Sequence, residues 1–273
     1  MDTLSFTKMV GAGNDFVVLN NMDGALSIDE ARLNKFAFKV CQRRVGVGAD
    51  GLLVLEPSQK ADFKMRILNP DGDEVSMCGN GSRCAARFAF IHQIAKERMT
   101  IETLAGSLRA DIIGEEVKVK MTDPEDLRLG FSLDVDGKDE VANFVNTGVE
   151  HVVIFVDDVD SLNVVKIGSK VRYHKQFAPR GANANFVELI DKENIKVRTY
   201  ERGVENETLA CGTGATASAI IAGILKGVTS PVRVKTKGGC YLRIFFKLKE
   251  HEVSEVYMQG DAQISYEGKV KYV

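Results

Sequence analysis

Met77-Cys78-Gly79-Asn80-Gly81 recurs in a closely similar form as Ala210-Cys211-Gly212-Thr213-Gly214. Each copy opens a run of small and apolar residues, about 78–95 and 211–225, that is typical of a helix. Glycine lets backbone N–H groups approach a ligand closely, and a helix N-terminus carries hydrogen-bond donors and partial positive charge. The pattern therefore predicts two helices, each with a thiol at its positive end, where the thiolate form is favoured.

The chain repeats its organisation around these two turns. Each half reads as strands, a Cys-Gly turn, a helix of small residues and more strands, and the halves meet near the break Met121-Thr122-Asp123-Pro124. The helix after Cys211 is apolar on almost all sides, which is typical of a buried helix. Two similar domains that face each other across a cleft would bring the two turns together.

Other elements follow from periodicity and capping. An amphipathic helix is predicted over 27–40, with Ser27 as its N-cap. Strand-like runs, several of which alternate apolar and polar residues, are predicted at 16–19, 52–55, 117–121, 151–156, 185–189, 195–200 and 232–236.

The composition narrows the class of protein. The chain has 273 residues, of which 44% are hydrophobic and 27% charged, with a formal net charge of −2. These values are ordinary for a soluble globular protein and do not suggest nucleic-acid or membrane binding. The N-terminus does not resemble a signal peptide, and no apolar run approaches the ~18 residues of a membrane span. We therefore expect a cytoplasmic protein with reduced thiols.

The five cysteines include no CxxC pair, and the four histidines are scattered. This arrangement argues against a disulfide framework and a zinc site, and no metal is predicted. A lone cysteine is usually an inert packed residue, an interpretation that we keep for Cys41, Cys84 and Cys240. The duplicated turn favours a chemical role for Cys78 and Cys211.

Two such thiols suit the inversion of a stereocentre. One thiolate can remove a proton from one face of a carbon while the other thiol returns a proton to the opposite face. The α-proton of an amino acid is difficult to remove because the adjacent carboxylate is already negative. Backbone donors at the turns would offset the developing charge, by ~2.7–4 kcal/mol per donor in known enzymes. No pyridoxal phosphate motif is identifiable, and thiols suit a route without a cofactor.

Six segments match a known family in order and span nearly the whole chain: 11–16, 44–51, 69–84, 146–151, 180–186 and 200–215. On these segments the chain resembles the diaminopimelate epimerase family. Related proline racemases typically have His after the first Cys-Gly, whereas this chain has Asn80. That difference favours the diaminopimelate branch.

The resemblance implies an α/β (α+β) fold of two pseudo-symmetric domains. Each would be a mixed β-sheet or barrel wrapped around a central helix, with the active site in the cleft between the domains. The N-terminal domain would span 1–122, with residues 262–273 returning to it, and the C-terminal domain would span 123–261. The implied isomerase is a homodimer with Tyr266 at its interface. It converts LL-2,6-diaminopimelate to the meso form without a cofactor, on the route to lysine and peptidoglycan.

The resemblance also implies roles for single residues. Cys78 and Cys211 would exchange the roles of proton donor and acceptor, and His151 and Glu201 would tune the two thiols. The implied substrate-binding residues, which include the carboxylate-binding turns, are Asn14, Asn69, Gly79, Asn80, Asn183, Glu201, Arg202, Gly212 and Thr213.

The hydrogen-bonding groups of these side chains match the charged groups of an amino acid substrate. Arg202 can bind a carboxylate with two parallel hydrogen bonds, and Glu201 can accept from an ammonium group. Taken singly, Arg202 also fits a surface ion pair, His151 a satisfied strand-edge histidine and Asn14 a turn former. The motif set favours the functional interpretation in each case.

The chain departs from the family pattern at three places. Val149-Glu150 stands before His151, where many members have Asn-Pro or a proline at the second position. Gly51 replaces a Gln of some members, and Ala182 replaces the more usual Thr. Positions 149, 51 and 182 therefore receive no site role.

Three alternative functions stay open at this point. The nearest is another cofactor-free racemase or epimerase, acting on proline or hydroxyproline, which a substrate panel would distinguish. A thiol redox switch would show reversible disulfide cycling and no solvent exchange at a substrate Cα. A non-enzymatic amino acid-binding module would bind without isotope exchange.

Overall fold

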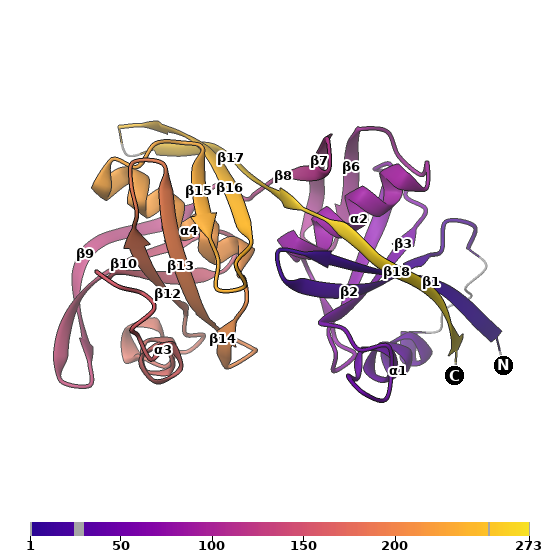
Figure 1. Cartoon of the computed structure of the whole chain (residues 1–273), viewed down its shortest axis with the longest axis horizontal. Helices are drawn as coiled ribbons and strands as arrows, with labels where there is room; N and C mark the ends of the chain where they lie inside the picture. The colour runs from indigo at the N-terminus through magenta and orange to yellow at the C-terminus, as the bar shows by residue number, and fades with distance from the viewer. Residues whose placement is uncertain (1, 25–29, 251, 273) are drawn as a thin grey trace. The chain divides into compact units, whose positions relative to one another are not determined.

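The computed structural model describes residues 2–24, 30–250 and 252–272. They form two compact units: unit 1 comprises Met1–Lys120 with Gln259–Val273, and unit 2 comprises Met121–Met258. Each unit is a mixed sheet with few helices, as the ribbon shows (Figure 1).

The strands of unit 1 surround helix α2. The elements of unit 1 are β1 (Asp2–Gly11), β2 (Asn14–Asn20), α1 (Glu30–Cys41), β3 (Gly51–Glu56), β4 (Phe63–Leu68), β5 (Glu74–Val75), α2 (Gly79–Ile91), β6 (Arg98–Thr103), β7 (Gly106–Ile113), β8 (Glu116–Lys120) and β18 (Gln263–Tyr272).

Unit 2 surrounds helix α4 in the same way. Its elements are β9 (Glu125–Val135), β10 (Lys138–Asn146), β11 (Glu150–Phe155), α3 (Val164–Arg172), the 3₁₀ turn η1 (Lys175–Phe177), β12 (Asn183–Leu189), β13 (Asn194–Glu201), β14 (Asn206–Thr208), α4 (Gly212–Lys226), β15 (Val232–Lys235), β16 (Tyr241–Lys249) and β17 (Glu252–Asp261), whose last residues belong to unit 1.

The two units repeat the same strand pairings. In unit 1, β1 is antiparallel to β2, β2 parallel to β3, β3 antiparallel to β4, and β4 antiparallel to β5 but parallel to β6. In unit 2, β10 to β15 follow the same order of directions. The outer partner of β1 is β18, and that of β10 is β9, both antiparallel. The two-repeat α/β fold predicted from the sequence is therefore confirmed.

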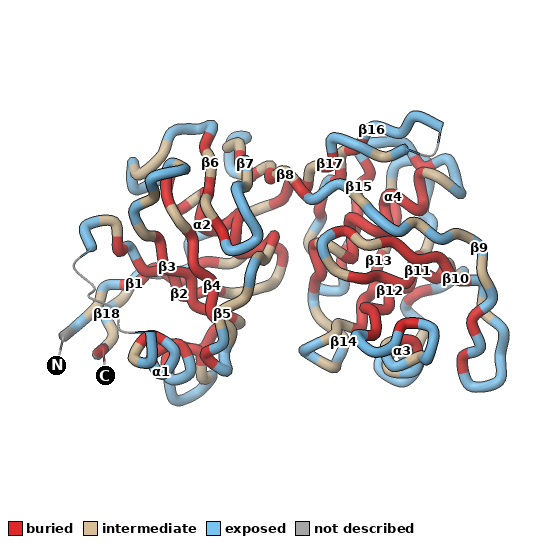
Figure 2. Tube along the Cα trace, turned by 180° about the vertical axis from the view of Figure 1, so that it is seen from behind, coloured by how far each residue is buried: buried red, intermediate tan, exposed pale blue. Residues whose placement is uncertain are grey.

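Both central helices are rich in small residues because strands pack closely around them. Nearly every residue of α4 from Gly212 to Gly223 is buried, and α4 contacts β10 to β13, β15 and β16. Helix α2 is buried from Gly79 to Ala86 and contacts strands β1 to β4, β7 and β8. In Figure 2 both helices lie in the most buried part of their own unit. A helix in this position needs no polar face, and the sequence of α4 has almost none.

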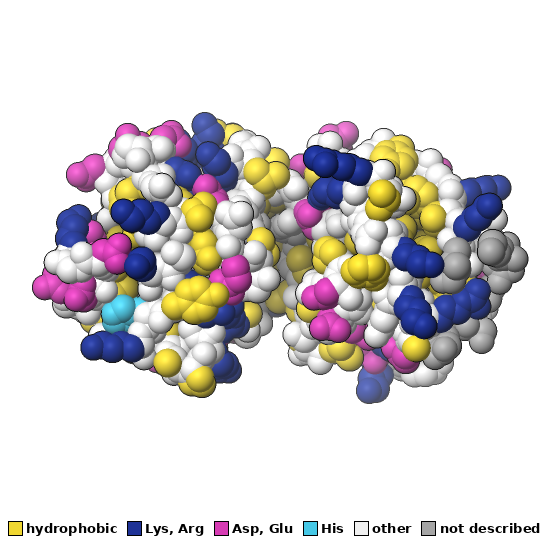
Figure 3. All heavy atoms as spheres, turned by 90° about the horizontal axis from the view of Figure 1, so that it is seen from below, with side chains coloured by type: hydrophobic (Ala, Val, Ile, Leu, Met, Phe, Trp, Pro, Cys, Tyr) yellow, Lys and Arg dark blue, Asp and Glu magenta, His cyan; other side chains and the backbone are white. Residues whose placement is uncertain are grey.

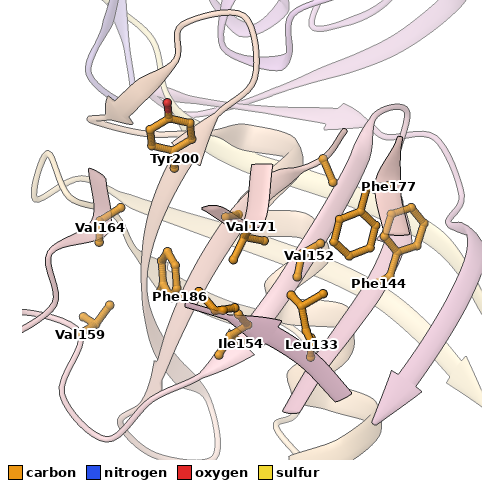
Figure 4. Close-up of a cluster of buried hydrophobic side chains, with 14 residues drawn as sticks. Leu133, Phe144, Val152, Ile154, Val159, Val164, Val171, Phe177, Phe186 and Tyr200 are labelled. Carbon is orange, nitrogen blue, oxygen red and sulfur yellow. The ribbon is translucent and has the colours of Figure 1, made fainter. Parts of the chain in front are cut away.

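A second helix covers the outer side of each sheet. In unit 1, Leu33, Phe36 and Val40 of α1 join a buried cluster with side chains of β2, β3 and β4. In unit 2, Val164 and Val171 of α3 pack with the strand side chains labelled in Figure 4. Burying one such side chain contributes about 1.5–3 kcal/mol, so these layers hold the strands that carry the candidate site.

The predicted strands agree with the structure more closely than the predicted helices do. All seven predicted strand runs overlap strands, and three of them, 117–121, 151–156 and 232–236, extend one residue beyond the end of the strand. Helix α1 begins at Glu30 among the described residues, and the predicted N-cap Ser27 lies outside them. Helix α2 ends at Ile91, about one turn before the predicted end, and α3 was not predicted.

The end of α2 has a definite cause. Gln93 adopts a left-handed conformation with φ of 58°. The N–H groups of Gln93 and Ile94 donate to the carbonyls of Phe90 and Ala89 at 3.1 and 2.8 Å. This is the Schellman arrangement, which satisfies the last carbonyls and ends a helix.

Figure 3 shows Lys and Arg side chains interspersed with Asp and Glu over the visible surface of each unit. Within the described part of the chain, no helix is both long and apolar enough to span a membrane.

Candidate active site

The first cysteine turn, residues 77–81, opens helix α2 as predicted. Cys78 is the N-cap, with an extended backbone (φ −143°, ψ 118°), and its sulfur accepts a hydrogen bond from the Gly81 N–H at 3.5 Å. The side chain is half-buried. A backbone donor and the positive end of a helix both favour negative charge on this sulfur. The turn is therefore suited to hold a thiolate that a ligand can reach.

The second cysteine turn, residues 210–214, opens α4 in the same way. Cys211 is the N-cap (φ −123°, ψ 111°), and its Sγ lies 3.5 Å from the hydroxyl oxygen of Thr213. The carbonyl of Thr213 accepts a hydrogen bond from Thr147 at 3.1 Å. Cys211 is buried, in contrast to Cys78. The two turns thus share one backbone design but differ in exposure.

Gly214 shows why the second turn needs glycine. A Cβ at this position would lie 2.3 Å from Oδ1 of Asn185 and 3.3 Å from Sγ of Cys211. The first distance is far below van der Waals contact, so the Asn185 side chain could not keep its place. Asn185, on β12, therefore packs directly against the turn that carries Cys211.

His151 is connected to the second cysteine turn through Asn185. The Nδ2 of Asn185 lies 3.1 Å from Nδ1 of His151 and donates to the Val152 carbonyl at 2.9 Å. Oδ1 of Asn185 accepts from the Thr199 hydroxyl at 2.9 Å. These contacts fix which end of the amide carries the N–H groups, so Nδ1 of the neutral imidazole is an acceptor and its proton lies on Nε2.

His151 is fully buried. Burial first, and the positive charge of Arg202 second, lower the pKa of His151 to about 3. The ring is therefore neutral at physiological pH. Among the described residues its Nε2 atom has no hydrogen-bond partner, and a buried N–H without an acceptor is unusual in folded proteins.

Four predicted site residues of unit 2 lie where strands β11, β12 and β13 meet. His151 pairs with Asn183 in the parallel register of β11 and β12. Oδ1 of Asn183 accepts from the Arg202 backbone N–H at 2.7 Å. Glu201 ends β13, and its Oε2 accepts from the Thr208 hydroxyl at 3.0 Å. The structure thus brings together His151, Asn183, Glu201 and Arg202.

Arg202 has a partner that sequence reasoning missed. Its Nη1 lies 2.8 Å from Oε2 of Glu150 and also donates to the Gly181 carbonyl at 3.0 Å. The other Glu150 oxygen pairs with Arg180 at 2.7 Å. The Glu150 side chain is 12% exposed, so this is a partly desolvated cluster of two guanidinium groups and one carboxylate. It keeps one excess positive charge, which suits an anionic ligand.

The three predicted substrate-binding asparagines of unit 1 are Asn14, Asn69 and Asn80. Nδ2 of Asn80, on α2, donates to Oδ1 of Asn14, the first residue of β2, at 2.5 Å. Nδ2 of Asn14 donates to Asp50 at 3.0 Å, and Oδ1 of Asn80 accepts from Arg83 at 2.9 Å. Asn69 follows β4, and its N–H and carbonyl brace the turn that leads into β5. Sequence reasoning found the amides but not Asp50 and Arg83.

Two other cysteines fit the inert packing that the sequence suggested. Cys41 and Cys84 are buried, and burial raises the pKa of each thiol to about 12. Cys240 is half-buried. Tyr266 is 47% exposed, and its ring makes an edge contact with Phe6. No group of three or more His, Cys, Asp or Glu side chains is arranged for a metal ion in the described ranges.

Comparison with known sequences gives one consistent result. The profile of the family described as diaminopimelate epimerase matches residues 6–127 and 143–265. The chain is 44% identical over 277 residues to the diaminopimelate epimerase of Aquifex aeolicus (strain VF5), covering 98% of each protein. It is 43% identical over 279 residues to that of Archaeoglobus fulgidus, covering 97% of this chain and 95% of the relative.

Solved structures share the fold at low identity. A phenazine biosynthesis protein of the PhzF family from Bacillus anthracis aligns with a TM-score of 0.78 and 17% identity, covering 99% of this chain and 100% of the other. A probable proline racemase from Agrobacterium radiobacter K84 aligns with a TM-score of 0.71 and 14% identity, covering 98% and 93%. Fold, matched segments and near-complete coverage agree: the chain belongs to the diaminopimelate epimerase family, a family of isomerases.

Proposed function

We propose that this protein interconverts LL-2,6-diaminopimelate and meso-2,6-diaminopimelate by a two-base mechanism that uses two cysteines and no cofactor. The observation that supports it most directly is the duplicated N-cap cysteine: Cys78 begins α2 and Cys211 begins α4. Family membership supports the substrate, because the curated relatives named above are diaminopimelate epimerases.

The proton transfers balance without another reagent. One cysteine, as thiolate, takes the proton from the α-carbon and becomes a thiol, while the bonding electrons remain on carbon. The other cysteine, as thiol, gives its proton to the opposite face and becomes the thiolate. The reverse reaction exchanges the two roles. The mechanism requires both sulfurs to reach one α-carbon, and this requirement is part of the proposal.

The developing negative charge needs stabilisation at the substrate carboxylate. We assign this role to the backbone N–H groups of Gly79, Asn80, Gly212 and Thr213, which stand in the first turn of α2 or α4. The first N–H groups of a helix point away from its own carbonyls and towards a ligand. Removal of one such donor in other enzymes lowers kcat by ~10²–10³-fold.

His151 and Glu201 would tune the two thiols. The low pKa of His151 makes a cationic role unsuitable, so we propose that the neutral ring donates its Nε2–H to a sulfur. A hydrogen bond donated to the thiolate favours the charged form. Glu201 would instead act as a carboxylate that holds the proton of its partner thiol or accepts from a substrate ammonium group.

The non-reacting end of the substrate carries a carboxylate and an ammonium group. Arg202 would bind the carboxylate, supported by the excess positive charge of the cluster around Glu150. Asn14, Asn69 and Asn183 would supply amide contacts to the substrate. We further propose a homodimer with the exposed Tyr266 at its interface. The proposed setting is the cytoplasm, on the route to lysine and peptidoglycan.

The decisive experiment is incubation of the reduced protein with LL-diaminopimelate in deuterium oxide, without added cofactor. We expect loss of the Cα–H signal and formation of the meso isomer. Cys78→Ala and Cys211→Ala should each abolish net epimerisation, whereas Cys240→Ala, a half-buried thiol outside both turns, should retain it.

Turnover like that of the wild type in either turn variant would refute the two-thiol mechanism. Absence of exchange in the reduced wild-type protein would refute the substrate, and proline and hydroxyproline would then be tested next.

A further inference from the structure

Four side chains of unit 1 form a continuous hydrogen-bonded chain with a charge at each end. Nη2 of Arg83 donates to Oδ1 of Asn80 at 2.9 Å, and Nδ2 of Asn80 donates to Oδ1 of Asn14 at 2.5 Å. Nδ2 of Asn14 then donates to Oδ2 of Asp50 at 3.0 Å. The chain joins helix α2 to the starts of strands β2 and β3.

The charged ends determine the orientation of both amides. A guanidinium group only donates hydrogen bonds, and a carboxylate only accepts them. Rotation of either amide by 180° would therefore place N–H against N–H at one contact and oxygen against oxygen at another. An amide pair without charged ends has no such restriction, because reversing both members keeps a hydrogen bond between them.

The cationic end is firmly anchored. Arg83 is fully buried on α2. Its other nitrogens donate to the carbonyls of Gly79 and Asp261, each at 3.4 Å. A buried guanidinium group cannot exchange its partners for water, so its contact with Asn80 persists. The first turn of α2, which Cys78 caps, is thereby tied to the amide chain.

The anionic end is held by a separate group of contacts. Oδ1 of Asp50 pairs with Arg43 at 2.8 Å, and Oδ2 accepts from the Asp15 N–H at 3.2 Å. In return, the Asp50 N–H donates to Asp15 at 3.1 Å. Asp15 is paired with Arg43 and Lys8. Burial raises the pKa of Asp15, but hydrogen bonds from Arg43 and Lys8 outweigh this effect and lower it below its usual value.

We propose that Arg83 and Asp50 are positioning residues for substrate binding: together they lock Asn80 and Asn14 with their amide N–H groups directed along the chain. Each primary amide has two N–H groups, and the chain uses one of each. The second N–H of each is the donor that a substrate carboxylate requires. This inference rests on the proposed function, in which Asn14 binds the substrate through its side-chain amide and Asn80 through its backbone N–H, and it adds the side-chain amide of Asn80 to these contacts.

Asp50→Asn is the sharpest test because it removes the obligatory acceptor with little change in shape. The Asp50 side chain is 38% exposed, so the variant is expected to fold. An amide at this position can present oxygen or N–H, and Asn14 can then reverse. We expect KM for diaminopimelate to rise about tenfold with kcat nearly unchanged, because a contact common to bound substrate and transition state is weakened.

Asp62→Asn is the matched control. Asp62 lies in the same unit, and its Oδ2 accepts from the backbone N–H and hydroxyl of Thr100 at 2.7 and 2.8 Å, away from the amide chain. The control should keep the wild-type KM and kcat. Both variants are also compared, without substrate, by the ¹⁵N side-chain amide signals of Asn14 and Asn80. Only Asp50→Asn should shift these signals and speed their hydrogen exchange.

The two measurements separate the proposals. Unchanged amide signals in Asp50→Asn would overturn the positioning role, whatever the substrate. Shifted signals with a KM like that of Asp62→Asn would overturn the role of the amides in binding. Failure of the wild-type protein to turn over diaminopimelate would overturn the proposed function itself, while the amide signals would still report whether Asp50 orients the chain.

Discussion

Acidification should destabilise this protein through His151. The ring is fully buried and its pKa is lowered from 6.5 to about 3, first by burial and then by Arg202. The unfolded chain therefore binds a proton between these two pKa values that the folded chain does not bind. Stability from this group is complete above pH 6.5 and is lost progressively as the pH falls towards 3.

The magnitude follows from the unfolded pKa. At about pH 5 the unfolded histidine is protonated and the folded one is still neutral, so the loss is about 1.5 pH units at about 1.4 kcal/mol each, or about 2 kcal/mol. The result is insensitive to the folded pKa as long as that value stays well below 5. Acidification to about pH 5 should therefore, through His151 alone, remove a considerable part of the ~5–15 kcal/mol of unfolding free energy of a typical domain.

The assay is urea unfolding of the wild type, His151→Gln and His92→Gln at about pH 8 and about pH 5. The decrease in the free energy of unfolding from about pH 8 to about pH 5 should be about 2 kcal/mol smaller in His151→Gln than in the wild type. His92 is exposed, so His92→Gln should keep most of the wild-type pH dependence. The reasoning would be refuted by equal losses in His151→Gln and the wild type, or by NMR ring signals of His151 that titrate between these pH values.

Two further predictions concern the cysteine turns. Gly214→Ala should lower the free energy of unfolding by about 2 kcal/mol more than Gly81→Ala, since a Cβ at 214 meets Oδ1 of Asn185 at 2.3 Å whereas at 81 it meets a leucine methyl at 3.2 Å. Equal effects in chemical denaturation would contradict that packing argument. Mild oxidation should link Cys78 to Cys211 if both thiols act on one carbon, and peptide mass spectrometry that finds no such link would count against the two-thiol proposal.

The sequence predicted the elements that small residues and strand alternation determine. The starts of α2 and α4 were predictable because each cysteine turn combines glycines with a following run of small residues, which is a clear local pattern. In the structure Cys78 and Cys211 are the N-caps of these helices. The predicted end of α2 was wrong because Gln93 occupies the left-handed position that ends the helix. A glycine at this position would have indicated the helix end in the sequence. Helix α3 was not predicted because it has only nine residues, too few for a clear periodic pattern. It is stabilised by packing against β12 and β13, which the local sequence does not show.

The candidate site was predictable in its membership but not in its connections. Arg83 and Asp50 both lie within segments that match the family, 69–84 and 44–51, yet nothing local indicates that they end one hydrogen-bonded chain. Nothing in the sequence gives Glu150 a site role, and only the tertiary structure pairs it with Arg202. Asn185 was read as a strand residue, and its contact with Gly214 depends on how α4 packs against β12.

The discontinuity of unit 1 has a consequence for biosynthesis on the ribosome. Unit 2 is a single stretch, Met121–Met258, whereas unit 1 needs Gln259–Val273 to supply β18, the antiparallel partner of β1. Domains generally fold as units while the chain emerges. We therefore expect unit 2 to complete its fold before unit 1, although unit 1 begins first in the sequence. Until β18 has been synthesised, one edge of β1 remains unpaired. During that interval the nascent chain is most vulnerable to aggregation and to chaperone capture.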